Sequence, residues 1–188
     1  MIRTEPMPRT GLSMALVLLA ALLIVTLAPS ARAEVRESSE HGFVLENVET
    51  VPVGRDAVWA ALIDIARWWP SGHTWWGDAS KLSINPVAGG CFCEIDGERQ
   101  AEHMRVVFVE PGQILRLTGG LGPLQGIGIN GILEFRIDDI LGGGSTITLS
   151  YRFSGQMPQE RDAFIEVVDR VQGGQLGGLG KLLREQGK

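Results

Sequence analysis

Apolar positions along the chain repeat with two different periods, and the change of period separates strands from helices. Residues 160–184 place apolar side chains on one helical face, and residues 54–69 do so until Pro70 stops the pattern. The other runs are rich in β-branched residues or alternate apolar with polar residues, which is typical of strands. These runs cover residues 43–53, 82–87, 91–95, 101–109, 114–118, 132–137 and 146–153.

Short turns between consecutive strands predict an antiparallel sheet. The turn signals are Gly-Gly at 89–90, Asp-Gly-Glu-Arg at 96–99 and Glu-Pro-Gly at 110–112. A curved sheet that packs on one long helix buries an apolar face of each. We therefore predict an α+β fold in which a curved antiparallel sheet of about seven strands surrounds the C-terminal helix.

The first 33 residues have the pattern of a secretory signal peptide. Arg3 and Arg9 precede an apolar run over residues 12–27, and Ala31 and Ala33 form an Ala-x-Ala cleavage site. A permanent membrane anchor is the alternative, but the run is short for a span, which needs about 20 apolar residues. We expect cleavage after Ala33 and a periplasmic or secreted protein that no longer associates with the membrane.

Cleavage would leave a mature chain of one ordinary domain. We expect a loose segment over residues 34–42 and a single domain over residues 43–188. The formal net charge of the whole chain is −5, and the predicted leader removes more basic than acidic residues. An acidic chain without basic clusters argues against nucleic acid as a partner.

The stretch from Trp68 to Glu94 concentrates the residues that most often form sites. It contains four of the five tryptophans, both cysteines and one of the three histidines, His73. Tryptophan is usually mostly buried and its indole N–H then needs a partner. Crowding of this residue beside ionisable groups indicates the wall or mouth of a cavity.

His73 and Asp78, with two tryptophans between them, are the first candidates for chemistry. A histidine beside a carboxylate can act as a general acid or base near neutral pH, with Asp78 or Glu94 orienting the ring. The alternative is a structural loop in which His73 and Asp78 bond the backbone.

The turn at residues 96–99 predicts a hairpin with Cys93 opposite Glu102 and Ile95 opposite Gln100. Strict alternation then divides eight side chains between two faces. One face carries Cys91, Cys93, Glu102 and Met104, and the other carries Phe92, Glu94, His103 and Arg105.

Two assignments of these faces remain open. We favour burial of the face that carries the thiols, with Glu94, His103 and Arg105 in solvent. In the alternative, paired carboxylates or a Glu–His pair faces the cavity and transfers protons.

The cysteines admit three states. Residues i and i+2 of a regular strand are about 6.6–7 Å apart, so a Cys91–Cys93 disulfide needs a local kink. Two buried thiols are therefore the favoured state. A metal site of both cysteines with His103 matches no trusted zinc spacing. We predict no metal and no cofactor.

Glycines gather in two places, residues 119–131 and residues 173–180. The first group lacks the Lys-Ser/Thr of a phosphate loop and predicts strand curvature or close backbone approach. Each glycine within a helix costs about 1 kcal/mol relative to alanine, so the second group needs a reason. Close helix–sheet approach, cavity space, a bend and fraying are the possibilities.

The chain resembles the SRPBCC superfamily, with its START-like, helix-grip fold. The polyketide cyclase/dehydrase-like and chaperone-ATPase-activator-like branches are the most similar. The resemblance spans residues 43–184. It is carried by Val58-Trp59-Ala60-Ala61-Leu62, Arg67-Trp68-Trp69, Ala88-Gly89-Gly90, Val109-Glu110-Pro111-Gly112, Leu115-Arg116-Leu117 and residues 146–151.

This resemblance implies a cavity between the sheet and the long helix. Members of the superfamily bind lipids, sterols, polyketides or aromatic metabolites, and some catalyse cyclisation or dehydration. We expect an exported protein that binds a small hydrophobic or amphipathic molecule. The alternatives are a cyclase- or dehydratase-type enzyme with a His/carboxylate pair and, less favoured, a protein–protein regulatory module. The expected ligand-binding residues are Trp69, Trp75, Trp76, Phe92, Glu102, His103, Leu121, Leu124 and Ile127.

Overall fold

The computed structural model describes residues 34–39, 41–155 and 157–187, which all lie in the second of two compact units, Ala31–Lys188. The predicted leader over residues 1–33 lies outside the described residues. Within the described ranges, no helix is both long and apolar enough to cross a membrane.

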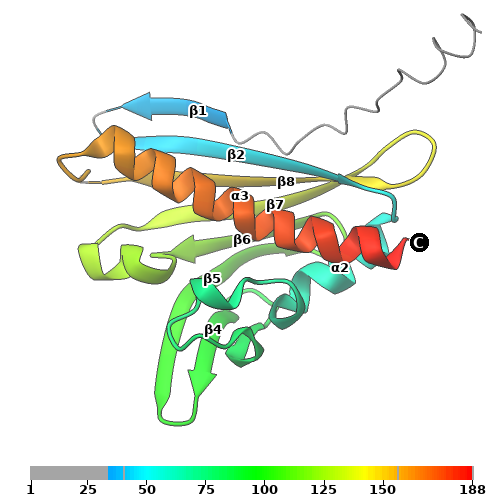
Figure 1. Cartoon of the computed structure of the whole chain (residues 1–188), viewed down its shortest axis with the longest axis horizontal. Helices are drawn as coiled ribbons and strands as arrows, with labels where there is room; N and C mark the ends of the chain where they lie inside the picture. The colour runs from blue at the N-terminus through cyan, green and yellow to red at the C-terminus, as the bar shows by residue number, and fades with distance from the viewer. Residues whose placement is uncertain (1–33, 40, 156, 188) are drawn as a thin grey trace, which may run out of the picture. The chain divides into compact units, whose positions relative to one another are not determined.

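Eight antiparallel strands form one curved sheet in the order β1-β2-β8-β7-β6-β5-β4-β3 (Figure 1). The strands are β1 (Glu34–Ser39), β2 (Gly42–Val51), β3 (Leu82–Ile84), β4 (Cys91–Asp96), β5 (Arg99–Glu110), β6 (Ile114–Gly119), β7 (Gly131–Asp139) and β8 (Ser145–Ser154). The predicted α+β class and antiparallel sheet are confirmed. Each of the seven predicted strands is present with small shifts of its ends.

The eighth strand, β1, lies where the sequence predicted a loose segment. It pairs with β2, with Val35 opposite Leu45 and Ser38 opposite Phe43. The segment is polar and has no apolar alternation, so periodicity does not reveal it. Its backbone groups pair with β2, which would otherwise be the edge of the sheet.

The helices are α2 (Arg55–Ile63) and α3 (Arg161–Gln186), with short 3₁₀ helices η1 (Ile65–Arg67), η2 (Ser71–His73), η3 (Ala79–Lys81) and η4 (Gly122–Ile127). The first predicted helix, over residues 54–69, therefore ends at Ile63. The Trp68 indole N–H donates to the carbonyl oxygen of Ala61 at 3.0 Å and also approaches that of Leu62. At the end of α2, the backbone N–H of Asp64 also donates to the Ala61 carbonyl oxygen, so the indole bond is a second contact to that helix end.

Helix α3 crosses the sheet and packs against β2 and α2 (Figure 1). Its buried apolar side chains meet the inward side chains of the central strands to form the core. The members from α3 are Ile165, Val168, Leu176, Leu179 and Leu183, and those from the central strands include Leu45, Leu117, Leu133, Phe135, Leu149 and Tyr151.

Three glycines of α3 permit this close approach. A Cβ atom at Gly173 would lie 2.8 Å from Asn47 Oδ1, and one at Gly180 would lie 2.8 Å from Glu49 Oε2. A Cβ at Gly178 would clash with the carbonyl oxygen of Trp68. Close packing, one of the predicted explanations, therefore accounts for these three positions, whereas Gly174 has open space around it.

Candidate functional site

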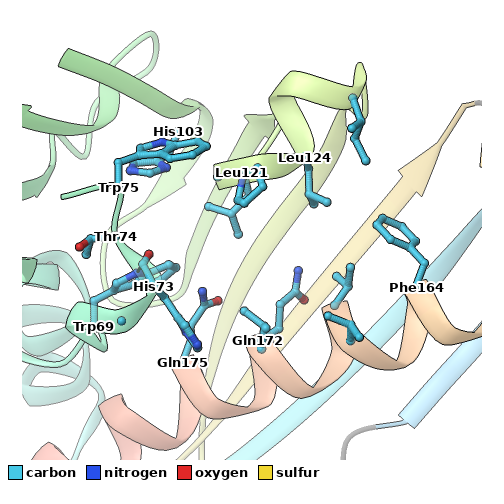
Figure 2. Close-up of a pocket in the computed structure, with 17 residues that line it drawn as sticks. Trp69, His73, Thr74, Trp75, His103, Leu121, Leu124, Phe164, Gln172 and Gln175 are labelled. Atoms are coloured by element: carbon cyan, nitrogen blue, oxygen red, sulfur yellow. Dashed lines mark hydrogen bonds between the residues drawn. The ribbon is translucent and has the colours of Figure 1, made fainter. Parts of the chain in front are cut away.

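A cavity of about 420 Å³ lies between η2, η4, β5 and α3 (Figure 2). Apolar side chains form most of its wall, including Leu121 and Leu124 from the η4 segment and Phe164 and Val168 from α3. Hydrophobic walls with a few polar groups are typical of small-molecule sites, and this volume is within their usual range.

The predicted residues divide into those that line this cavity and those that do not. The lining includes His73, Trp69, Trp75, His103, Leu121, Leu124 and Ile127. Phe92 is instead in the core, with its ring centroid 5.3 Å from that of Trp69 and 5.0 Å from that of His103. Trp76 and Glu102 lie outside the cavity wall, in a shallow groove that they share with Gln125.

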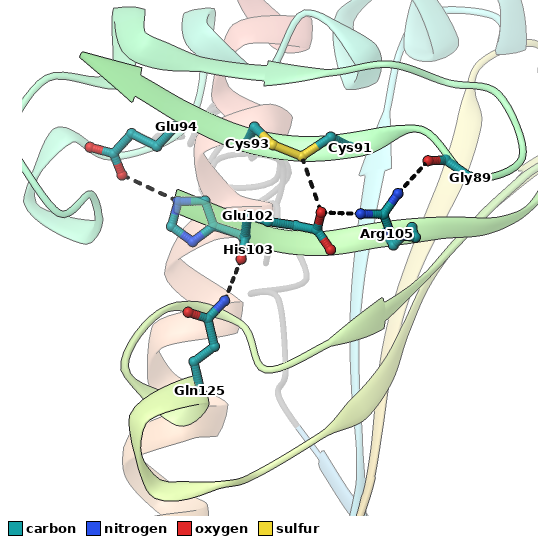
Figure 3. The surroundings of a disulfide bond; sticks show 8 residues. All are labelled: Gly89, Cys91, Cys93, Glu94, Glu102, His103, Arg105 and Gln125. Atoms are coloured by element: carbon teal, nitrogen blue, oxygen red, sulfur yellow. Dashed lines mark hydrogen bonds and ion pairs between the residues drawn. A yellow bond between two sulfur atoms is a disulfide. The ribbon is translucent and has the colours of Figure 1, made fainter. Parts of the chain in front are cut away.

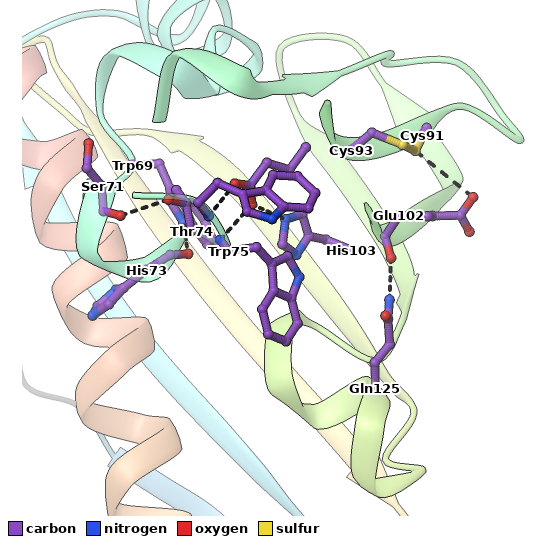
Figure 4. Close-up of polar contacts among 12 residues, drawn as sticks. Trp69, Ser71, His73, Thr74, Trp75, Cys91, Cys93, Glu102, His103 and Gln125 are labelled. Atoms are coloured by element: carbon purple, nitrogen blue, oxygen red, sulfur yellow. Dashed lines mark hydrogen bonds and ion pairs between the residues drawn. A yellow bond between two sulfur atoms is a disulfide. The ribbon is translucent and has the colours of Figure 1, made fainter. Parts of the chain in front are cut away.

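Two turns shape the mouth of the cavity. In η2, the Trp69 indole N–H donates to the His73 carbonyl oxygen at 3.0 Å, and Thr74 Oγ1 donates to the Ser71 carbonyl oxygen at 2.8 Å (Figure 4). In η4, the Gln125 side-chain amide donates to the Glu102 carbonyl oxygen, which ties this turn to β5 (Figure 3).

The glycines on either side of η4 allow the backbone to pass close to neighbouring groups, as the sequence predicted. A Cβ at Gly131 would lie 2.7 Å from the Tyr151 ring, and one at Gly120 would lie 2.5 Å from the Ile129 carbonyl oxygen. These glycines let the ends of the turn pass directly against the sheet.

Glu94 forms a buried pair with His103, a residue of the cavity wall (Figure 3). Glu94 is completely buried, and its Oε2 lies 3.2 Å from His103 Nε2. The backbone N–H groups of Trp75 and Trp76 donate to the same carboxylate at 2.9 and 3.1 Å. The carboxylate therefore accepts three hydrogen bonds and joins the tryptophan loop to the hairpin.

These contacts decide the tautomer of His103. A carboxylate only accepts, so Nε2 carries the proton of the shared bond. Burial lowers the pKa of His103 more than the bond to Glu94 and its charge raise it, so the ring is neutral near pH 7. Nδ1 is then an acceptor, and it is buried without a hydrogen-bond partner among the residues that the structure describes.

His73 and Asp78, the predicted acid–base pair, lie in different surroundings. His73 is exposed at the mouth of the cavity. Asp78 is exposed at the start of η3, where it accepts from the backbone N–H of Ser80 at 2.9 Å. The side chain and backbone N–H of Ser80 lower the pKa of Asp78. The described contacts include no bond between the two, and Asp78 has the capping role of the structural alternative.

The pairing predicted for the hairpin is confirmed, but the favoured assignment of its faces is wrong. Cys93 lies opposite Glu102 and Ile95 opposite Gln100. A β-bulge then leaves His103 without a register partner, because the next pair is Phe92 with Met104. An extra residue breaks alternation.

As a result, His103 and Met104 are both buried, and Arg105 faces solvent on the side of Glu102. Met104 and Arg105 have therefore exchanged faces relative to strict alternation. Glu94 and His103, which the favoured assignment placed in solvent, point into the protein.

Cys91 and Cys93 form a disulfide on the outer side of β4 (Figure 3). The prediction of two buried thiols is therefore wrong. Their Cα atoms are 5.4 Å apart, closer than the spacing of a regular strand. The irregular register next to Cys93 supplies the kink that the bridge requires.

Two glutamines of α3 also line the cavity, and neither was among the residues predicted from the sequence. Gln172 is 1% exposed, and within the described part of the chain neither its amide oxygen nor its amide nitrogen has a partner. Gln175, one turn later, is also buried and lines the cavity. Both occupy the apolar stripe of α3, four residues after Val168 and Val171 respectively. A polar residue at such a position is an exception to the apolar pattern, and this exception could have indicated them from the sequence.

Among the described residues, no group of three or more His, Cys, Asp or Glu side chains could hold a metal ion.

Comparisons with known proteins place the fold. No protein-family model matches the chain, and no curated protein matches its sequence. Solved structures that it resembles include MLL2253 from Mesorhizobium loti, with TM-score 0.56, 18% identity, and coverage of 76% of this chain and 97% of that one. CalU16 from Micromonospora echinospora has TM-score 0.54 and 17% identity over 82% of this chain and 83% of its own.

A third similar structure is DynU16, a protein of the dynemicin biosynthetic locus. The TM-score is 0.55 and the identity 20%, over 80% of this chain and 49% of DynU16. The fold is a helix-grip fold. At these identities the likeness extends to the architecture alone, and function has to be argued from the site.

Proposed function

We propose that this protein binds a small, largely apolar molecule in the cavity between the sheet, η4 and α3. The observation that carries the proposal is an apolar cavity of about 420 Å³ lined by His103 and Gln172, which have buried polar atoms without partners among the described residues. Buried polar groups in folded proteins are normally hydrogen-bonded. A bound molecule would supply both the apolar contact and the missing partners.

The helix-grip fold and the resemblance to the SRPBCC superfamily agree with this proposal. The similarity to CalU16 and to DynU16, a protein of a biosynthetic locus, adds that secondary metabolites are one class of ligand to test. Export, as the leader predicts, would make this a periplasmic or secreted binding protein.

Fluorescence titration with N-phenylnaphthylamine, an uncharged dye that brightens in apolar surroundings, tests the proposal. We expect saturable binding to the chain that begins at Glu34, with energy transfer from Trp69 and Trp75 in the wall. Val171→Phe, which adds a ring on a cavity-lining position, should weaken binding. Arg170→Phe adds the same ring to an exposed neighbouring position and is the matched control. Absence of saturable binding, or equal binding by both variants, would contradict the proposal.

A second candidate function is acid–base catalysis of the cyclase or dehydratase type in the same cavity. The specific observation in its favour is the buried Glu94–His103 pair, in which a carboxylate orients a neutral imidazole whose second nitrogen is free to take a proton. His73 at the cavity mouth is the other histidine within reach of a bound molecule.

Mass spectrometry of small molecules that co-purify with the protein separates the two functions. A retained molecule that is unchanged after incubation supports binding alone. Its conversion by the parent chain, with loss of conversion in Glu94→Gln, supports catalysis.

A further inference from the structure

His103, a residue of the cavity wall, has one ring nitrogen that is buried without a hydrogen-bond partner among the described residues. The side chain is 4% exposed, lines the cavity, and has Nε2 committed to Glu94. Nδ1 therefore presents a lone pair and no proton. The group that fits it is a donor, such as the O–H of an alcohol or phenol.

The charges around the cavity exclude an anionic head group from this position. No lysine or arginine lies among the described residues that line the cavity. The nearest charged partner of the imidazole is the Glu94 carboxylate, 3.2 Å from Nε2. A carboxylate or phosphate placed at Nδ1 would lose its water without gaining a cation or a donor from His103 or Glu94, which is unfavourable.

Gln172 adds a second, neutral contact on the opposite wall. Its side chain projects from α3, whereas His103 belongs to the hairpin side of the cavity (Figure 2). Both amide atoms lack partners in the ranges that the structure describes. An amide donates and accepts, so it suits a carbonyl or a second hydroxyl group on an uncharged ligand.

We propose that the cavity selects an uncharged, mainly apolar molecule that carries a hydroxyl group, and that His103 Nδ1 accepts the hydrogen bond from this hydroxyl. The inference rests on the proposed binding function and narrows its ligand class. Fatty acids and other apolar anions are excluded from that class, whereas hydroxylated ring compounds belong to it.

Three probes with the same ring system test this selectivity in the parent chain at neutral pH. They are β-naphthol, its methyl ether and β-naphthoate, each titrated by displacement of N-phenylnaphthylamine. The ether has the same oxygen as naphthol but no donor, so one neutral hydrogen bond separates the two. We expect naphthol to bind about threefold to tenfold more tightly than the ether. Naphthoate should bind most weakly.

His103→Gln is the informative variant, because its side-chain N–H can still donate to Glu94 while the acceptor at Nδ1 is lost. We expect its affinities for naphthol and for the ether to become equal. His41→Gln changes an exposed histidine outside the cavity and should retain the selectivity of the parent. If His103→Gln does not fold, the three probes on the parent chain still decide the ligand class.

Each outcome has one meaning. Saturable binding with equal affinity for naphthol and ether, or with naphthoate preferred, overturns this inference and leaves the binding function intact. Selectivity that survives in His103→Gln overturns the role of His103. Failure of every probe and of the dye to bind overturns the binding function, and the inference with it.

Discussion

Glu94 Oε2 lies 3.2 Å from His103 Nε2, although the two residues are not partners in the register of the β4–β5 hairpin. Glu94 is opposite Ala101, and His103 is the extra residue of a bulge. Bulges re-aim side chains, and this one turns the imidazole inward to meet the carboxylate. The same carboxylate fixes the backbone of Trp75 and Trp76. The buried Glu94 carboxylate thus positions two residues of the cavity wall, His103 and Trp75.

Glu94→Gln should destabilise the protein. The amide keeps one acceptor oxygen but turns an NH₂ group toward N–H donors, so at least one buried bond to a charged group is lost. We expect a decrease of about 1.5–3 kcal/mol in the free energy of unfolding, measured by urea titration. Glu98→Gln, in the exposed turn of the same hairpin, is the control and should change little. Equal stability of the two variants would show that the three bonds to Glu94 contribute nothing.

The stability of the protein should decrease as the pH falls below about 6.5, the reference pKa of histidine. Burial lowers the pKa of His103 in the folded protein, so the unfolded chain binds a proton that the folded chain excludes. The free energy of unfolding therefore decreases as pH is lowered through this window.

Urea midpoints measured across this pH window check the sign. The decrease should be smaller in His103→Gln, which cannot titrate, than in the parent or in His41→Gln, which keeps His103. A parent whose midpoint follows that of His103→Gln at every pH would contradict a buried neutral imidazole.

The disulfide should contribute modestly to global stability. Cys91 and Cys93 close a very short loop, so the chain-entropy estimate for the double variant Cys91→Ser, Cys93→Ser is a loss of about 1–2 kcal/mol. Reductant should lower the free energy of unfolding of the parent, measured by urea titration, by a similar amount and leave that of the serine variant unchanged. Two free thiols titrated in the denatured, unreduced protein would show that the bridge does not form.

Two glycines of α3 should respond oppositely to alanine. Gly178→Ala introduces a Cβ against the Trp68 carbonyl oxygen, and we expect a loss of about 1–3 kcal/mol from overpacking. Gly174→Ala has open space and removes the entropic cost of a helical glycine, so it should stabilise the protein by about 0.5–1 kcal/mol. Chemical denaturation measures both. Effects of the same sign would contradict the close approach of α3 to Trp68.

Export remains a prediction from the first 33 residues. Amino-terminal sequencing of protein recovered from the periplasm or the medium should return Glu34 as the first residue. Ala33→Leu removes the small residue before the cleavage site and should slow processing. Native protein that begins at Met1, or that stays in the membrane fraction, would rule out cleavage.

The strands β2 to β8, the helix α3 and the turn at residues 96–99 could be predicted from the sequence alone. These features depend on local periodicity and turn chemistry, which a single chain displays directly. The crowded tryptophans beside ionisable groups also predicted a cavity wall, whereas the contacts at Leu121, Leu124 and Ile127 were expected together with the cavity that the family resemblance implies. Strand β1 has no such local pattern, since it is held by backbone pairing alone.

The buried face of the hairpin could not be predicted from the sequence and is known from the tertiary structure. Strict alternation predicts the wrong face for residues that follow a bulge, because the extra residue reverses the alternation. The position of the bulge depends on pairing across strands rather than on local sequence. That single extra residue brings His103 to Glu94, and the irregular register beside it accompanies the Cys91–Cys93 bridge. The place of Gln172 in the cavity could not be predicted for a related reason. The helical pattern shows a polar residue in an apolar stripe, but only the packing of α3 against the other elements shows that this residue lines a cavity.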